Sequence, residues 1–174
     1  MPATRASGAR AYLVGCCTPE MPPTLAATLD RLANVLLAQG DFAGAGKPLD
    51  EVVDVRRRLA AGTPGPVAVR NLAVALNRCG DVRTALKDND GAIKLYQEAL
   101  TIVRQLAAAD PSNAGLQRDV AVSLWKLAGV SGSPIHWADV AGQLDGMRQK
   151  GQLAVSDNAN LAEAQKRAAA EVAK

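Results

Sequence analysis

The chain has 174 residues, of which 48% are hydrophobic and only 3% aromatic, and its formal net charge at pH 7 is +3. This length suits one domain or a short array of repeats, and the small, interspersed charge argues against a surface dedicated to nucleic acid or to a membrane. The three cysteines, Cys16, Cys17 and Cys79, show no metal-ligand spacing, which favours a reduced, cytoplasmic protein.

The first 23 residues are expected to be a flexible tail. The tetrapeptide LVGC, residues 13–16, resembles a lipoprotein cleavage box. However, only about four apolar residues separate Arg10 from Gly15, whereas a signal sequence needs about 7–15. Export is therefore not expected, and the segment TPEMPP, residues 18–23, marks the start of folded structure.

Residues 25–64 and 72–111 repeat one another. At an offset of 47 and without gaps, 16 of the 40 aligned positions are identical. A third copy begins at an offset of 48 and stops matching at SGSP, residues 131–134. A repeat of this length predicts a stack of small structural units that bury their apolar faces against one another.

Each unit is predicted to be two helices joined by a turn. In the second copy, apolar residues recur at helical spacing over residues 72–86 and again over residues 92–106. The segment KDNDG, residues 87–91, supplies the turn, with Asn89 or Asp90 as the helix N-cap. Small residues along both helices allow close backbone approach, so that a core poor in aromatics can still be dense.

The sequence ALKDNDGAIKLYQEALTI, residues 85–102, resembles the second half of a tetratricopeptide repeat, and LANVLLAQGDFAGA, residues 32–45, resembles the first half. The family's pattern of large and small positions is matched in the two copies by Leu29, Leu32, Ala33, Ala45, Leu49 and Val52, and by Leu76, Cys79, Gly80, Ala92, Tyr96 and Ala99. The phrase LAAADPSNAGLQRDVAVSL resembles long-repeat members from bacteria. The usual period is about 34 residues, so both helices are expected to be about two turns longer.

This resemblance implies an all-α fold, a right-handed superhelical stack of antiparallel helix pairs closed by a C-terminal capping pair. The units are expected at residues 24–66 and 67–112, with a partial third unit at residues 113–133 and the capping pair at residues 134–174. Pro48 falls inside the second helix of the first unit. Because a proline in a helix interior costs about 3 kcal/mol, this helix is expected to start late, near Pro48, or to kink.

The capping helices have their own predicted boundaries. Ser133 and Pro134 are spaced as an N-cap and a first helical residue, so they open a helix that ends near Gly151. Ser156 or Asp157 starts the last helix, and Asn160 and Glu163 have the spacing of a capping box.

No catalytic, cofactor or metal site is predicted. His136, the only histidine, is expected to be structural or exposed, and Cys79 falls at a core position of the repeat, so the two are not expected to form a catalytic dyad. The phosphate-loop, serine-nucleophile and zinc-protease motifs are absent. The basic cluster Arg56–Arg58 lies in the last turns of a helix, where cations favour the helix dipole. We expect neither an enzyme nor a nucleic-acid-binding protein.

In tetratricopeptide stacks the first helix of each unit lines a concave groove. The resemblance therefore assigns candidate partner-binding residues Asp30, Asn34, Asn77, Asp81 and Trp125. Asp30 and Asp81 stand where cations would be needed to grip a carboxylate, so the groove is expected to suit a basic or amphipathic protein segment. Trp125 is either an anchor for a partner or a residue packed under the C-terminal helices.

Together these observations predict a non-enzymatic scaffold for protein–protein contact, with no cofactor and no membrane segment. Two alternatives stay open. The chain could be the regulatory or sensory tail of a larger bacterial signalling system, or a homo-oligomer that associates through an uncapped first repeat.

Overall fold

A computed structural model describes residues 23–62 and 65–173. Over these residues the chain forms seven α-helices and one 3-10 turn, and no strand. The elements in chain order are α1 (Pro23–Ala38), α2 (Phe42–Gly62), α3 (Pro66–Ala85), α4 (Asn89–Ala109), α5 (Ala114–Ala128), α6 (Trp137–Gln149), η1 (Val155–Asp157) and α7 (Asn158–Val172). The predicted tail falls on residues outside this description, except Pro23, which begins α1.

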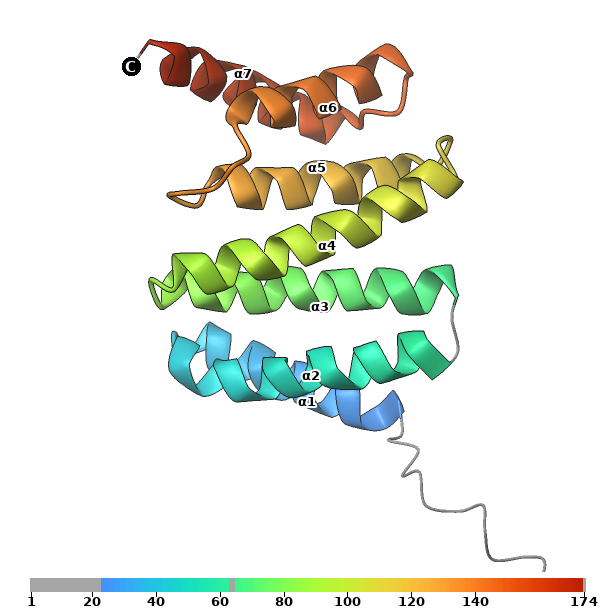
Figure 1. Cartoon of the computed structure of the whole chain (residues 1–174), viewed down its shortest axis with the longest axis vertical. Coiled ribbons are helices and arrows are strands. Elements are labelled where there is room, and N and C mark those ends of the chain that lie inside the picture. Colours follow the sequence, from blue (N-terminus) through green and yellow to red (C-terminus); the bar gives the residue numbers. More distant parts are fainter. Residues whose placement is uncertain (1–22, 63–64, 174) are drawn as a thin grey trace, which may run out of the picture.

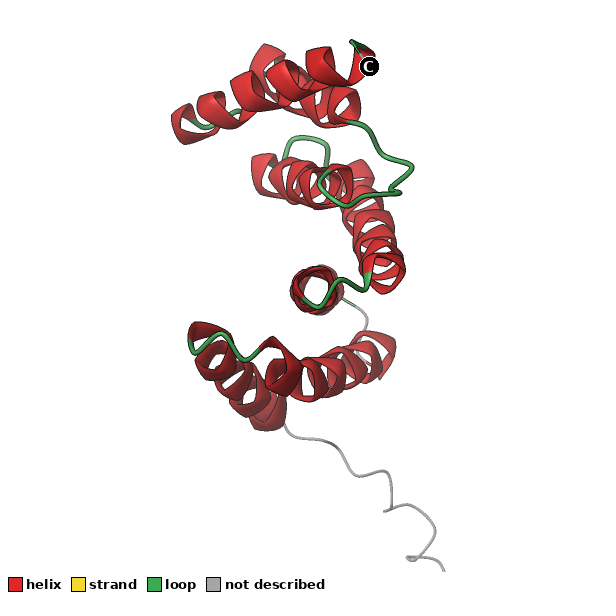
Figure 2. Cartoon of the chain, turned by 90° about the vertical axis from the view of Figure 1, so that its left-hand side faces the viewer, coloured by secondary structure: helices red, strands yellow, loops and turns green. Residues whose placement is uncertain are grey.

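The helices are stacked in the order of the sequence, and each packs mainly on its neighbours along the chain (Figure 1). Turned by 90°, the stack follows an arc (Figure 2). The two repeated pairs are α1 with α2 and α3 with α4. Helix α5 is the first helix of the partial third unit, and α6 and α7 close the far end. The predicted all-α solenoid of helix pairs is confirmed, and α2, α3 and α4 have the expected extra length of 20 to 21 residues.

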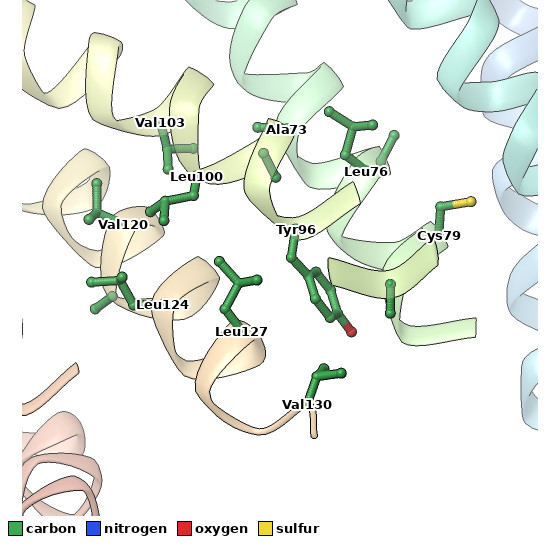
Figure 3. Close-up of a cluster of buried hydrophobic side chains, with 14 of the residues drawn as sticks. Ala73, Leu76, Cys79, Tyr96, Leu100, Val103, Val120, Leu124, Leu127 and Val130 are labelled. Carbon is green, nitrogen blue, oxygen red and sulfur yellow. The ribbon is translucent and has the colours of Figure 1, made fainter. Parts of the chain in front are cut away.

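The core runs through the stack as a continuous line of aliphatic side chains. Between α3, α4 and α5 it includes Leu76, Leu100 and Leu127, all at most 4% exposed (Figure 3). Tyr96 of α4 lies across Gly80 of α3, where a Cβ would collide with the ring. The small residue therefore permits the close approach that the sequence pattern predicts.

Helices α2 and α4, the second helices of the two repeated units, start with the same kind of cap. The Asp41 carboxylate accepts the Gly44 N–H at 2.8 Å, and the Asp88 carboxylate accepts the Gly91 N–H at 3.0 Å. A Cβ at either glycine would collide with the capping carboxylate, so the Asp-x-x-Gly pattern is conserved between the two repeats for a steric reason. The predicted caps Asn89 and Asp90 were wrong, because Asp88 is the N-cap of α4; Lys87, in the turn before it, takes a positive φ of 65°.

Pro48 does not delay its helix. Helix α2 begins at Phe42, six residues before the proline, because the Asp41 cap determines the start. Ala45 and Leu49, in the turn that contains Pro48, are fully buried. Their packing against the stack offsets the backbone hydrogen bond that the proline cannot make, so the predicted late start was wrong.

The capping pair begins later than predicted. Ser133 and Pro134 do not open α6; the Ser133 hydroxyl accepts the Ile135 N–H in a local turn, and α6 starts at Trp137. The Asp139 carboxylate accepts the His136 N–H at 2.9 Å and holds this start in place. The Asp139 side chain, just inside α6, therefore determines where the helix starts, and the Ser133-Pro134 pair does not.

In α7 the predicted capping box of Asn160 and Glu163 was also wrong. The Asn160 amide donates to Asp157, which precedes the helix, and Glu163 forms an ion pair with Arg167 one turn further on.

Candidate functional site

The five predicted partner-binding residues lie on α1, α3 and α5, the first helices of the three units. Three adjoining hollows follow these helices. One is lined by α1, the end of α2 and the start of α3; the second lies between α3 and α5; and the third lies between α5 and the C-terminal pair. Asp30 lines the first, Asn77 and Asp81 line the second, and Trp125 lines the third.

Asp30 is neutralised by two arginines. It is only 15% exposed and pairs with Arg56 of α2 and with Arg78 of α3, the latter at 2.5 Å. The second terminal nitrogen of the Arg78 guanidinium donates to the side-chain oxygen of Asn34. Asp30 and Asn34 therefore fasten the first unit to the second, and no bare acidic charge faces solvent at this position.

Asp81 is paired in the same way one unit further on. Its carboxylate accepts the Tyr96 hydroxyl at 2.8 Å and lies 2.5 Å from the Lys126 ammonium of α5. Between the two pairs, the Asn77 amide donates to the buried Ser123 hydroxyl at 3.1 Å, again joining α3 to α5.

Two more ion pairs extend this series. Arg70 of α3 pairs with Asp119 of α5, and Arg118 of α5 pairs with the buried Asp157 before α7. Hydrogen bonding to these carboxylates raises the pKa of each guanidinium. The surface is thus a ladder of inter-helix ion pairs, in which Asp30 and Asp81 each have a cation from an adjacent unit.

Trp125 packs against the C-terminal helices and also borders a cavity. Its ring packs edge-to-face on Trp137 of α6 at a centroid distance of 4.9 Å, and the Arg167 guanidinium of α7 lies 4.5 Å from the Trp137 ring centroid. Trp125 is only half-buried, and it also lines a cavity of about 310 Å³ together with Val122 and Lys126. The same residue therefore packs under the C-terminal helices and offers a surface toward this cavity.

Apolar side chains continue this surface from one hollow to the next. Val74 of α3 is 44% exposed and Val122 of α5 is 41% exposed. Val122 lines both the hollow between α3 and α5 and the cavity beside Trp125. Val74, Val122 and Trp125 therefore form a connected apolar strip, which we call the inner strip, flanked by charges that are already paired.

Comparison with known families agrees with this architecture. Residues 25–60, which comprise most of α1 and α2, match the model of the tetratricopeptide repeat. The chain therefore contains a tetratricopeptide repeat. No curated protein matches it. Repeats of this family generally mediate protein–protein contacts, and members are typically scaffolds without catalytic activity.

The reactive side chains of this tetratricopeptide protein are placed apart from one another. Cys79 is buried in α3, and its thiol donates to Asp50 with a sulfur–oxygen distance of 3.0 Å. Burial, together with this bond, raises the pKa of the Cys79 thiol to about 12. His136 is exposed beside Glu171 of α7. A buried thiol that resists ionisation is a poor nucleophile.

The described helices provide neither a cluster of metal ligands nor a membrane span. Within the described part of the chain, no three His, Cys, Asp or Glu side chains are arranged to hold a metal ion. None of its helices there combines the length and apolarity that crossing a bilayer requires.

Sequence reasoning missed the cations of the ladder. Arg78 and Lys126 occupy equivalent positions at an offset of 48, and so do Arg70 and Arg118. Each reaches an acidic residue on a neighbouring helix. Recurrence of a basic residue at one repeat position was the available signal, because identical positions on stacked helices come to lie side by side.

Proposed function

We propose that this tetratricopeptide protein is a non-enzymatic interaction module that binds an amphipathic segment of a partner protein along the inner strip. The supporting observation is the connection of Val74, Val122 and Trp125 across two hollows, within a surface whose charges are already satisfied. Burying these apolar side chains on binding would gain about 25 cal/mol per Å² of apolar area removed from water.

The charge ladder favours an amphipathic partner over a basic one. A lysine- or arginine-rich segment would have to displace the existing cation partners of Asp30 or Asp81. A partner helix whose apolar side chains recur at helical spacing would leave these ion pairs intact. Helices that bind in apolar grooves are a common mode of recognition. Trp125 supplies the large, rigid contact that is enriched among energetically dominant interface residues.

The test uses a displayed library of random peptides as the probe and the full chain as bait. Selected peptides are expected to carry apolar residues at spacings of three and four, and their affinity is measured by calorimetry. Val122→Glu places a charge in the middle of the strip and should weaken binding at least about tenfold, since each 1.4 kcal/mol is a factor of ten.

Val155→Glu is the matched control. Val155 is 88% exposed in η1 and does not line the inner strip, so the same substitution there should leave the affinity unchanged. Peptides that bind the Val122→Glu protein as well as they bind the wild type would show that recognition lies elsewhere. Circular dichroism of both variants verifies that the helices are retained.

A further inference from the structure

One face of α1 exposes residues whose counterparts elsewhere in the stack are buried. Leu32 and Val35 are 47% and 53% exposed. Their repeat equivalents are at most 6% exposed, namely Cys79 and Val82 on α3, Leu127 on α5 and Val130 just after α5. The family pattern predicts Leu32 as a core residue, so this exposure marks a face without its usual neighbour rather than an ordinary surface position.

The structure shows what covers this face in the other units. Helix α2 packs on α3, and Asp50 of α2 accepts the Cys79 thiol. Helix α4 packs on α5, where Leu127 and Val130 lie beside Tyr96 (Figure 3). In both cases the cover is the second helix of the preceding unit.

A cation accompanies the apolar residues at the same repeat position in all three units. Arg78 on α3 reaches back to Asp30 and Lys126 on α5 reaches back to Asp81, each on the first helix of the preceding unit. Arg31 is the equivalent residue on α1. It is exposed, and within the described part of the chain no carboxylate pairs with it.

We propose that Arg31, Leu32 and Val35, the α1 end face, dock a helix pair supplied by a partner protein. The partner's second helix would cover Leu32 and Val35 with an apolar stripe, and its first helix would place an acidic side chain against Arg31. The surface that fits is chemically the one that α3 and α4 present to α5. This site is separate from the inner strip, and the inference does not depend on the proposed function.

A second copy of this chain does not offer that chemistry. If two α1 end faces met, each would bring an arginine and no acid to the contact. At the other end of the stack, the acids of α7 are engaged, because Glu163 pairs with Arg167 and Glu171 accepts the Trp137 N–H. The partner is therefore a different surface that carries its own acidic group.

The test supplies such a helix pair in a known form. Residues 66–113 of the chain are duplicated and inserted between Pro22 and Pro23, so that the Asp81 of the duplicate can meet Arg31. The inserted unit should raise the thermal midpoint by about 10 °C, since stability in stacked repeats grows with each new interface. Leu32→Asp should remove most of this gain, and Arg31→Glu a smaller part of it.

The same two substitutions in the chain without the insert are the matched controls, and each should move its midpoint by less than about 2 °C. An insert that leaves the midpoint unchanged, or a gain that survives both substitutions, would overturn the proposal. So would concentration-dependent dimers of the wild-type chain in sedimentation that Leu32→Asp abolishes, because a second copy would then be the occupant. If Leu32→Asp destabilised the full chain but not a chain lacking residues 1–22, the occupant would be the chain's own first segment.

Discussion

At the amino-terminal end of the stack, Leu32 and Val35 of α1 keep about half of their surface exposed, whereas at the carboxy-terminal end Trp137 is only 7% exposed. Trp137 contacts both the Trp125 ring and the Arg167 guanidinium, and Leu161 of α7 is buried beside α6. A two-helix unit needs cover on both of its faces. Within its described residues this protein supplies that cover at one end and leaves the other end to be completed.

Disrupting the covered end should have the largest effect. Trp137→Ala removes a buried indole and its contacts with Trp125 and Arg167, so it should lower the free energy of unfolding by about 3–5 kcal/mol. Denaturant titration followed by circular dichroism measures the change. Val172→Ala, on the same capping pair but 89% exposed, is the control and should be close to neutral. A loss below about 1 kcal/mol for Trp137→Ala would mean that the capping pair contributes little to the stack.

The contrast between the ends can be measured at one repeat position. Leu127 is fully buried on α5, and Leu32 is its equivalent on α1. Leu127→Ala should cost about 3 kcal/mol because it leaves a cavity in the core, whereas Leu32→Ala should cost less than about 1 kcal/mol. Both are measured by denaturant unfolding. Equal costs would show that Leu32 is covered in solution, and the two ends would then be alike.

The sequence predicted the fold well because the repeat carries the information twice. Sixteen shared positions in 40 indicated both helix pairs, and Asp41 and Asp88 turned out to be equivalent caps. The predicted helix starts were wrong where two local features of the sequence favoured different boundaries. Pro48 stayed inside a helix because its neighbours are buried, and Ser133 made a turn rather than a cap.

The candidate surface was harder to predict than the fold. The positions of Asp30 and Asp81 on first helices could be carried over from the family, but their ion-pair partners could not, because these depend on which side chain the adjacent unit supplies. Arg78 and Lys126 fill that role across gaps of 48 and 45 residues. Pairings between stacked helices are tertiary information, and only the recurrence of a cation at one repeat position indicates them in the sequence.

The helix caps should behave alike in the two repeats, which would confine the contrast between the ends to the stacking faces. Asp41→Ala and Asp88→Ala each remove the acceptor for a glycine N–H at a helix start, and each should cost about 1 kcal/mol. Denaturant unfolding measures both, with Asp90→Ala as the control because Asp90 makes no cap in α4. A much smaller cost for Asp41→Ala would show that the first unit is already loosened at its start.

The one pH-dependent effect concerns Cys79, which is buried at the position where α1 exposes Leu32. The pKa of its thiol rises from 9.0 to about 12, chiefly through burial and then through the bond to Asp50. In the unfolded chain the thiol ionises near pH 9, while in the folded chain it keeps its proton, so the unfolded state binds fewer protons above pH 9. The stability that the protonated thiol contributes is therefore complete below pH 9 and is lost as pH rises toward 12. Unfolding titrations at pH 7, 9 and 10 should show the wild type losing more stability than Cys79→Ala over this window, whereas Leu32→Ala should follow the wild type at every pH. A constant difference between wild type and Cys79→Ala would mean that the thiol is accessible to solvent, and that α3, like α1, has an incompletely covered face.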